Sequence, residues 1–316
     1  MVAARFDPDP IKTMTPPRKT QRMRALIQAR EICVSPGVYD GYSLLLAEQM
    51  GFATASTSGA GLFNARFGQS ENFGVMSLLE NVEACRQLAA CVDIPLMADA
   101  DTGYGNAITV TQTVRHFEQA GIAGINIEDQ TFPKRCGHAE GKALIPVEDM
   151  VRKVEAAVHA RSDDDFIIVA RTDSIAVEGM DAAIERARAY AAAGADMIFP
   201  DAVRSEDQIR RFVDEVGIPI TINMGLGIRS RPTTPLIPIP KLEAMGVARV
   251  SLPRMLPAAA IMGMRQALQL MRESAQTGQI VDRPDLLVGV DEIMKLVHDD
   301  QVTTLEHQIF GPPPQA

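Results

Sequence analysis

The chain has 316 residues, of which 46 % are hydrophobic, so it can bury the core of one large domain or of two ordinary ones. Its formal net charge of −9 argues against nucleic acid or an anionic membrane as a partner, and no apolar run is long enough for a membrane span. The four cysteines have no paired spacing, which indicates a reducing compartment and makes a cytoplasmic location the expectation.

One pattern repeats along most of the chain: a short apolar run is followed by a longer stretch with helical periodicity. The runs that predict strands span residues 32–39, 52–59, 94–101, 124–129, 166–173, 195–202, 218–224 and 248–253. The stretches that predict helices span residues 42–50, 78–91, 109–120, 147–160, 181–193, 205–216, 240–246 and 257–275. This alternation favours a (β/α)8 barrel, because an open doubly wound sheet would carry a glycine-rich dinucleotide turn after its first strand.

The two ends of the chain do not fit the repeat. Residues 1–21 combine prolines with charges of both signs, which is typical of a loose N-terminal arm. Residues 282–316 contain a helical stretch that is surplus to a barrel spanning residues 22–281, and its apolar positions need a surface to pack on. We expect this tail to pack on a neighbouring subunit.

Acidic residues gather where the third and fourth predicted strands end, and in such barrels the chemistry lies at the carboxyl ends of the strands. Asp99 and Asp101 are two residues apart, so on an extended strand both point the same way, and Glu128 adds a third carboxylate. Converging carboxylates repel unless a cation lies between them, and hard oxygen ligands favour Mg²⁺, or else Mn²⁺, over zinc. The alternative is that the two aspartates only cap the next helix.

Residues suited to binding an anion follow other strands. After the second strand, Ser58, Gly59 and Ala60 offer small side chains and backbone N–H groups for a carboxylate, although they could form only a tight loop. Arg171 follows the fifth strand and could clamp a carboxylate, or it could pair with one of the acids. Two further residues are either pocket-lining or helix-capping: Asp201 and Asn223.

The loop after the fourth strand places Lys134, Arg135, Cys136 and His138 within five residues. A thiol among cations has a lowered pKa, so Cys136 is expected to exchange a proton near neutral pH. Zinc binding by Cys136 and His138 is the competing interpretation, but it lacks a second ligand pair nearby. The other cysteines lie in apolar contexts and are expected in the core: Cys33, Cys85 and Cys91.

The motifs "DADTGYGN", "IEDQ", "PKRCGH", "ARTD" and "GADMIFPDA", in this order and spacing, resemble the isocitrate lyase/phosphoenolpyruvate mutase superfamily. The Lys-Arg-Cys-Gly-His run resembles its carbon–carbon lyase branch, which includes 2-methylisocitrate and 2,3-dimethylmalate lyases. The resemblance implies a modified barrel whose eighth helix swaps between subunits, and a homotetramer built as a dimer of helix-swapped dimers.

The resemblance also implies a role for each site residue. Asp99 would bind Mg²⁺ directly, and Asp101 and Glu128 would bind it through water. The 2-oxo acid carboxylate would be held by Ser58, Gly59, Ala60 and Arg171. Cys136 would protonate the departing acid. Around the second carboxylate would lie Lys134, Arg135, Gly137 and His138, with Asp201 and Asn223 lining the pocket.

The implied activity is a Mg²⁺-dependent cleavage of a substituted malate or methylisocitrate-like acid. Several positions depart from the family pattern. Asn72 stands in place of aspartate and Asn126 in place of histidine. The stretch "NMGLGIRSRPTTP" loses a glutamate and gains Arg229 and Arg231 in the part of the pocket that selects the substrate. Oxaloacetate hydrolysis or decarboxylation is therefore the alternative, with phosphonate chemistry and a non-catalytic dicarboxylate sensor as further candidates.

Overall fold

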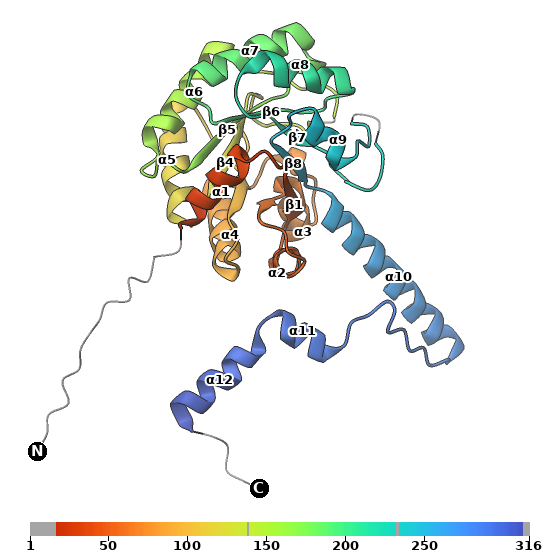
Figure 1. Ribbon diagram of the computed structural model, residues 1–316. Helices are drawn as coiled ribbons and strands as arrows, with labels where there is room; N and C mark the ends of the chain where they lie inside the picture. The colour runs from red at the N-terminus through yellow and green to blue at the C-terminus, as the bar shows by residue number, and fades with distance from the viewer. Residues whose placement is uncertain (1–16, 138, 232–233, 312–316) are drawn as a thin grey trace, which may run out of the picture.

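The computed structural model describes residues 17–137, 139–231 and 234–311. Its eight parallel strands are ordered β6-β5-β4-β3-β2-β1-β8-β7, and a parallel bridge between Ile198 and Ile220 joins the two edge strands (Figure 1). The strands are β1 Cys33–Val38, β2 Ala55–Thr57, β3 Leu96–Asp99, β4 Gly124–Glu128, β5 Ile167–Thr172, β6 Met197–Pro200, β7 Thr221–Asn223 and β8 Arg249–Leu252. Each lies within its predicted range, and the expected (β/α)8 architecture is confirmed as a nearly closed barrel.

The expected helices are also present around the barrel. The helices are α1 Lys19–Gln28, α2 Gly41–Gln49, α3 Gly59–Phe67, α4 Leu78–Cys91, α5 Ala107–Gln119, α6 Val147–Ala160, α7 Met180–Ala192, α8 Glu206–Val216, α9 Ile239–Ala244, α10 Met255–Thr277, α11 Val290–Leu296 and α12 Asp299–Phe310. Two 3₁₀ helices, η1 Glu71–Phe73 and η2 Ser174–Ala176, lie in loops. Two further helices, α1 and α3, were not predicted, because both lie outside the strand–helix repeat.

Local chemistry fixes where several of these helices begin and end. Ser77 and Glu80 form a reciprocal capping box at the start of α4. Ser205 caps α8, which ends at Gly217 in the left-handed conformation that glycine adopts most easily. These boundaries leave the loops at the carboxyl ends of the strands free to carry polar residues.

The first helix closes the amino-terminal end of the barrel. Met23 and Ile27 of α1 are buried against Cys33, Met97 and Ile167, which lie at or near the starts of their strands. The helix begins at Lys19, within the range expected to be an arm, and residues 1–16 of that arm lie outside the described part. With one end sealed by apolar contacts, the opposite end of the barrel is the one available to a ligand.

The long C-terminal helix α10 projects away from the barrel, whereas α11 returns to contact α2 (Figure 1). None of the 23 residues of α10 is buried, and this helix projects outward to a turn from which α11 and α12 run back alongside the molecule. Ile261, Met264, Leu268 and Met271 are all exposed and recur on α10 at intervals of three and four residues. Among the described helices, none combines the length and hydropathy that crossing a bilayer requires.

Candidate active site

Three acidic residues lie at or just beyond the carboxyl ends of β3 and β4. Asp99 ends β3 and Glu128 ends β4, whereas Asp101 lies beyond the strand with a φ of 56°. The argument from alternating strand residues is therefore wrong for Asp101. Asp101 lies near Asp99 because the chain turns back after β3. The backbone N–H of Asp101 donates to Asp99 Oδ1 at 3.0 Å.

Two of the acids carry buried oxygens that accept no hydrogen bond, although cations lie near them. Both carboxylate oxygens of Glu128 and Oδ1 of Asp101 are buried and accept no hydrogen bond. Burial raises the pKa of Glu128 well above its ordinary value and raises that of Asp101, although Lys134 opposes both effects. Unsatisfied buried oxygens of this kind fit a hard divalent cation.

Lys134 extends into the same acidic cluster. Its Nζ lies 3.2 Å from Glu71 and 3.7 Å from Asp101, and its side chain is 7 % exposed. Burial alone would lower the pKa of Lys134, but Glu128, Asp101 and their neighbours raise it well above the ordinary value. The ammonium is thus held protonated beside the carboxylates.

Arg171 forms the floor of the adjoining pocket. Its Nε donates to Asp173 at 2.8 Å, its Nη2 donates to Asp201 at 3.0 Å, and Glu128 lies 3.3 Å from Nε. Both interpretations made from the sequence therefore hold: the residue faces the pocket and also pairs with acids. Lys142 donates to Asp173 at 3.0 Å, and so the two cations hold the pKa of Asp173 below its usual range despite burial.

The Ser-Gly-Ala run lies at the start of a helix rather than in an irregular loop. Ser58 caps α3 by accepting from Gly61 N–H at 3.0 Å, and it lines the pocket with Gly59 and Ala60. A Cβ on Gly59 would clash with the carboxylate of Asp99, reaching 2.9 Å from its Cγ. The N-terminal end of α3, which carries partial positive charge, therefore lies directly beside Asp99. This helix end is also suited to binding a carboxylate of the ligand.

Two contacts hold the loop of residues 134–137, called the cysteine loop below, over the pocket. The backbone N–H of Cys136 donates to Asn72 Oδ1 at 2.9 Å, and Arg254 Nη2 lies 3.4 Å from the Cys136 sulfur. A Cβ on Gly137 would clash with Asp201 and with Arg171, so the loop can cross the pocket only with glycine there. The half-buried thiol consequently faces the pocket.

Glu71 connects this loop to the end of β8. It forms salt bridges with Lys134 and with Arg254, and its side chain is 10 % exposed. Burial alone would raise the pKa of Glu71, but the two cations more than offset that effect and leave the pKa below the ordinary value. The carboxylate is therefore ionised and clamps two cations of the site.

The loop after β7 completes the wall. Asn223 donates to Asp201 Oδ1 at 3.2 Å and accepts from Gly225 N–H at 2.7 Å. Arg231 lines the same pocket, and its Nη2 lies 3.5 Å from Asn223 Oδ1. Arg229 is exposed and does not line it.

The structure gathers most of the predicted site residues, but not all of them. Arg135 is exposed, with its guanidinium beside the Glu140 carbonyl, and it does not line the pocket. His138 lies outside the described residues. Cys91 was expected in the core but is exposed, because it lies on the outer face of α4. The residues that line the pocket are Ser58, Gly59, Ala60, Asp99, Lys134, Cys136, Gly137, Arg171, Asp201 and Asn223, together with Glu71, Arg231, Pro253 and Arg254.

Three functional candidates were missed from the sequence. Arg254 follows the predicted eighth strand directly, so the rule that strand ends carry the chemistry would have pointed to it. Asp173 ends the predicted fifth strand and could have been found in the same way. Glu71 carries no such signal, because it lies in a loop remote in sequence from every predicted strand end.

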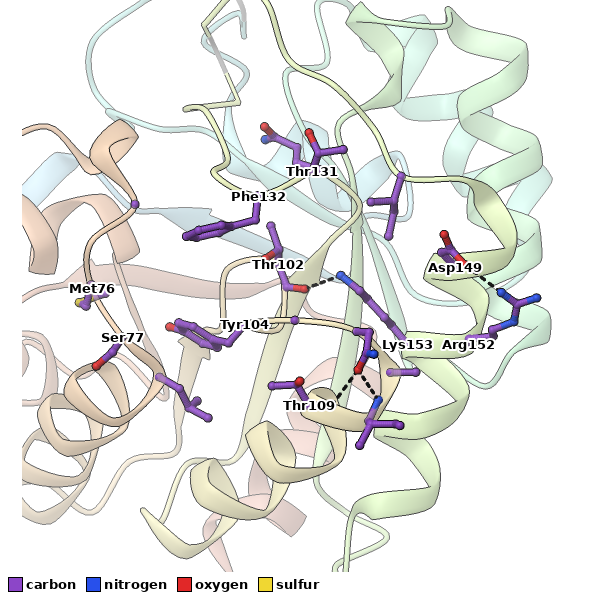
Figure 2. Close-up of a pocket in the computed structure, with 18 of the residues that line it drawn as sticks. Met76, Ser77, Thr102, Tyr104, Thr109, Thr131, Phe132, Asp149, Arg152 and Lys153 are labelled. Carbon is purple, nitrogen blue, oxygen red and sulfur yellow. Dashed lines mark hydrogen bonds and ion pairs between the residues drawn. The ribbon is translucent and has the colours of Figure 1, made fainter.

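A larger hollow, of about 1020 Å³, is lined by the loop that carries Thr102 and Tyr104 (Figure 2). Tyr104, Phe132 and Met76 line it. Lys153 donates to the Thr102 carbonyl at 2.9 Å and so braces that loop. Apart from Lys153, the charged residues lining it are Asp149 and Arg152, which pair with each other at 2.9 Å. The chemistry is concentrated in the smaller pocket.

Comparison with known proteins agrees with this geometry. The family model described as phosphoenolpyruvate phosphomutase matches residues 23–272. A 2-methylisocitrate lyase of Aeropyrum pernix is 41 % identical over 261 residues, which is 83 % of this chain and 82 % of that protein. A 2,3-dimethylmalate lyase of Eubacterium barkeri is 33 % identical over 286 residues, which is 90 % and 96 % of the two chains.

Solved structures show the same fold at similar identity. An oxaloacetate acetylhydrolase bound to the inhibitor 3,3-difluorooxalacetate superposes with a TM-score of 0.86 at 29 % identity, covering 94 % of this chain and 98 % of that one. A phosphonopyruvate hydrolase complexed with oxalate and Mg²⁺ gives a TM-score of 0.81 at 29 % identity, covering 93 % and 100 %.

Proposed function

The chain belongs to the isocitrate lyase/phosphoenolpyruvate mutase superfamily, and from that membership together with the pocket we propose that it is a Mg²⁺-dependent carbon–carbon lyase. Its substrate would be a substituted malate or methylisocitrate-like 2-hydroxy acid, cleaved to a 2-oxo acid and a second carboxylate. The observation that carries the proposal is the half-buried thiol of Cys136, which lies at a pocket that Arg171 and Asp99 also line.

The acidic cluster would hold the metal ion. Asp99 would bind it directly, and Asp101 and Glu128 would bind it through water, using the buried oxygens that accept no hydrogen bond from the protein. Within residues 17–137, 139–231 and 234–311, no three His, Cys, Asp or Glu side chains converge closely enough to enclose an ion by themselves. When bound, Mg²⁺ polarises the oxygen of the carbon that becomes the carbonyl.

The protein residues would divide the remaining work. The N–H groups at the start of α3, together with Arg171, orient the carboxylate of the 2-oxo acid half. The substrate hydroxyl gives its proton to water, the adjacent carbon–carbon bond breaks as the carbonyl forms, and the electron pair of the broken bond stays on the departing acid. Cys136 then delivers a proton to that carbon. Lys134 and Arg254 lie beside this position and favour negative charge there.

A panel assay tests the proposal. The protein, with Mg²⁺ and then with EDTA, is incubated with 2-methylisocitrate, 2,3-dimethylmalate and oxaloacetate, and the released 2-oxo acids and carboxylates are identified. We expect pyruvate from one of the hydroxy acids and none in EDTA. Oxalate from oxaloacetate alone would instead establish the hydrolase alternative, and no product from any acid would leave a dicarboxylate-binding protein.

The proposal includes the assembly. The exposed apolar stripe of α10 and the exposed apolar residues of α11 and α12 would pack on a second copy of the chain, giving a homotetramer of two helix-swapped dimers. Light scattering of the full chain and of a variant ending at residue 281 tests this point. We expect a tetramer for the full chain and a smaller species for the truncated one. A free thiol at Cys136 suits the reducing cytoplasm expected from the sequence.

A further inference from the structure

Arg231 is a pocket cation whose charge is not matched by a carboxylate among the described residues. Arg171, Lys134 and Arg254 each form a salt bridge with an acidic side chain. The salt bridges within the described residues include none to Arg231. Its guanidinium lies 3.5 Å from the amide oxygen of Asn223, and its Nε is buried without a hydrogen bond partner.

The half-buried guanidinium of Arg231 has no carboxylate partner among the described residues, and this is unfavourable unless a ligand supplies one. Burial lowers the pKa of Arg231, although Asp201 and Cys136 lie close enough to oppose that effect. Removing a charge from water without pairing it costs free energy, and that cost is offset when an anion binds beside it. The position is thus suited to a ligand that brings a negative charge of its own.

The loop after β7 is built to hold this side chain at the pocket wall. Gly225 has a φ of 58°, and a Cβ there would clash with the Arg231 guanidinium, lying 2.7 Å from Nε. The backbone of Arg231 pairs with that of Thr234, which is buried. Arg229, two residues earlier, is exposed instead. The two arginines gained in this loop therefore have different environments, and only Arg231 faces the reacting groups.

We propose that Arg231 binds the second carboxylate of the fragment that Cys136 protonates, which succinate has and propionate lacks, and that it thereby makes the enzyme selective for tricarboxylate over dicarboxylate hydroxy acids. This inference rests on the proposed function, because it assigns the departing fragment to the side of the pocket that holds Cys136. Selectivity follows because a dicarboxylate substrate would leave the half-buried guanidinium without a carboxylate partner, whereas the additional carboxylate of a tricarboxylate would pair with it.

Kinetics of three variants test the inference. Arg231→Met removes the charge at similar volume, Arg231→Lys keeps the charge without the planar fork, and Arg229→Met is the matched control in the same loop. For Arg231→Met we expect kcat/KM to fall about 100-fold with 2-methylisocitrate, the scale of a lost buried charge contact, and to change less than about 3-fold with 2,3-dimethylmalate. Arg231→Lys should recover part of the loss, and Arg229→Met should match the wild type.

Calorimetry separates this inference from the proposed function, since it needs no turnover. Succinate and propionate, the fragments with and without the extra carboxylate, are titrated into wild type and Arg231→Met with Mg²⁺ and pyruvate present. Tighter binding of succinate by the wild type, lost in Arg231→Met, supports the inference even if no acid in the panel is cleaved. An equal preference in both proteins, or no preference in the wild type, overturns it even if lyase activity is found.

Discussion

Replacing Glu71 with glutamine removes the carboxylate that ties the cysteine loop to the end of β8. The substitution keeps the shape of the side chain but leaves Lys134, 7 % exposed, and Arg254, 33 % exposed, without their shared partner. Breaking a fully buried ion pair costs about 3–5 kcal/mol. The cost should be smaller here, because water partly solvates Arg254 and because Lys134 still has Asp101 as a partner at 3.7 Å. We therefore expect Glu71→Gln to cost about 2–3 kcal/mol.

This free energy stabilises the loop conformation that places Cys136 over the pocket. If all of it is lost from transition-state stabilisation, kcat/KM falls roughly 30- to 160-fold. Steady-state kinetics at saturating Mg²⁺ measure the loss. Glu83→Gln is the matched control, because Glu83 forms an exposed pair with Arg86 on α4 and should leave kcat/KM unchanged. If Glu71→Gln retains the wild-type kcat/KM, Glu71 does not position the loop.

Three other predictions follow from the site. Asp99→Ala should abolish Mg²⁺-dependent turnover while shifting Tm by no more than about 3 °C, and activity that persists at ordinary Mg²⁺ would show that the cluster is not the metal site. Cys136→Ser should lower kcat roughly 10²-fold or more with KM nearly unchanged, because a hydroxyl is a much weaker acid than a thiol; normal turnover would place the proton donor elsewhere. Brief alkylation with iodoacetamide at about pH 8, read by peptide mapping, should label Cys136 and the exposed Cys91 but spare Cys33 and Cys85, because burial raises the pKa of Cys85 to about 12 and also raises that of Cys33. Labelling of Cys85 at the rate of Cys91 would contradict the burial argument.

The barrel could be predicted from the sequence because each strand and its following helix change hydrophobic period at a visible boundary. The same regularity located Asp99, Glu128, Arg171, Asp201 and Asn223, since each lies at or next to the carboxyl end of a strand. For these residues, position along the chain is sufficient to fix position in space.

Residues between the regular elements were beyond that reasoning. Glu71 meets Lys134 across 63 residues of sequence, and no local pattern specifies such a contact. Asp101 reached the expected place for an unexpected reason, a left-handed turn rather than a longer strand. Arg135 has the same charge as its neighbour Lys134, and only the path of the loop directs one outward and the other into the acids.

Asn72 shows how the structure changes the meaning of a departure from the family pattern. From the sequence, this asparagine is only a missing aspartate. In the structure its amide oxygen accepts the Cys136 N–H at 2.9 Å, a bond that an uncharged acceptor makes without adding negative charge beside the thiol.

Cleavage of 2-methylisocitrate in D₂O, with the products analysed by mass spectrometry, tests the central claim most directly. If Cys136 protonates the departing fragment after the carbon–carbon bond breaks, each succinate released should carry one deuterium on carbon, and the accompanying pyruvate should carry none from the cleavage step. Succinate formed without deuterium, or the same labelled succinate produced at full rate by Cys136→Ser, would contradict the account.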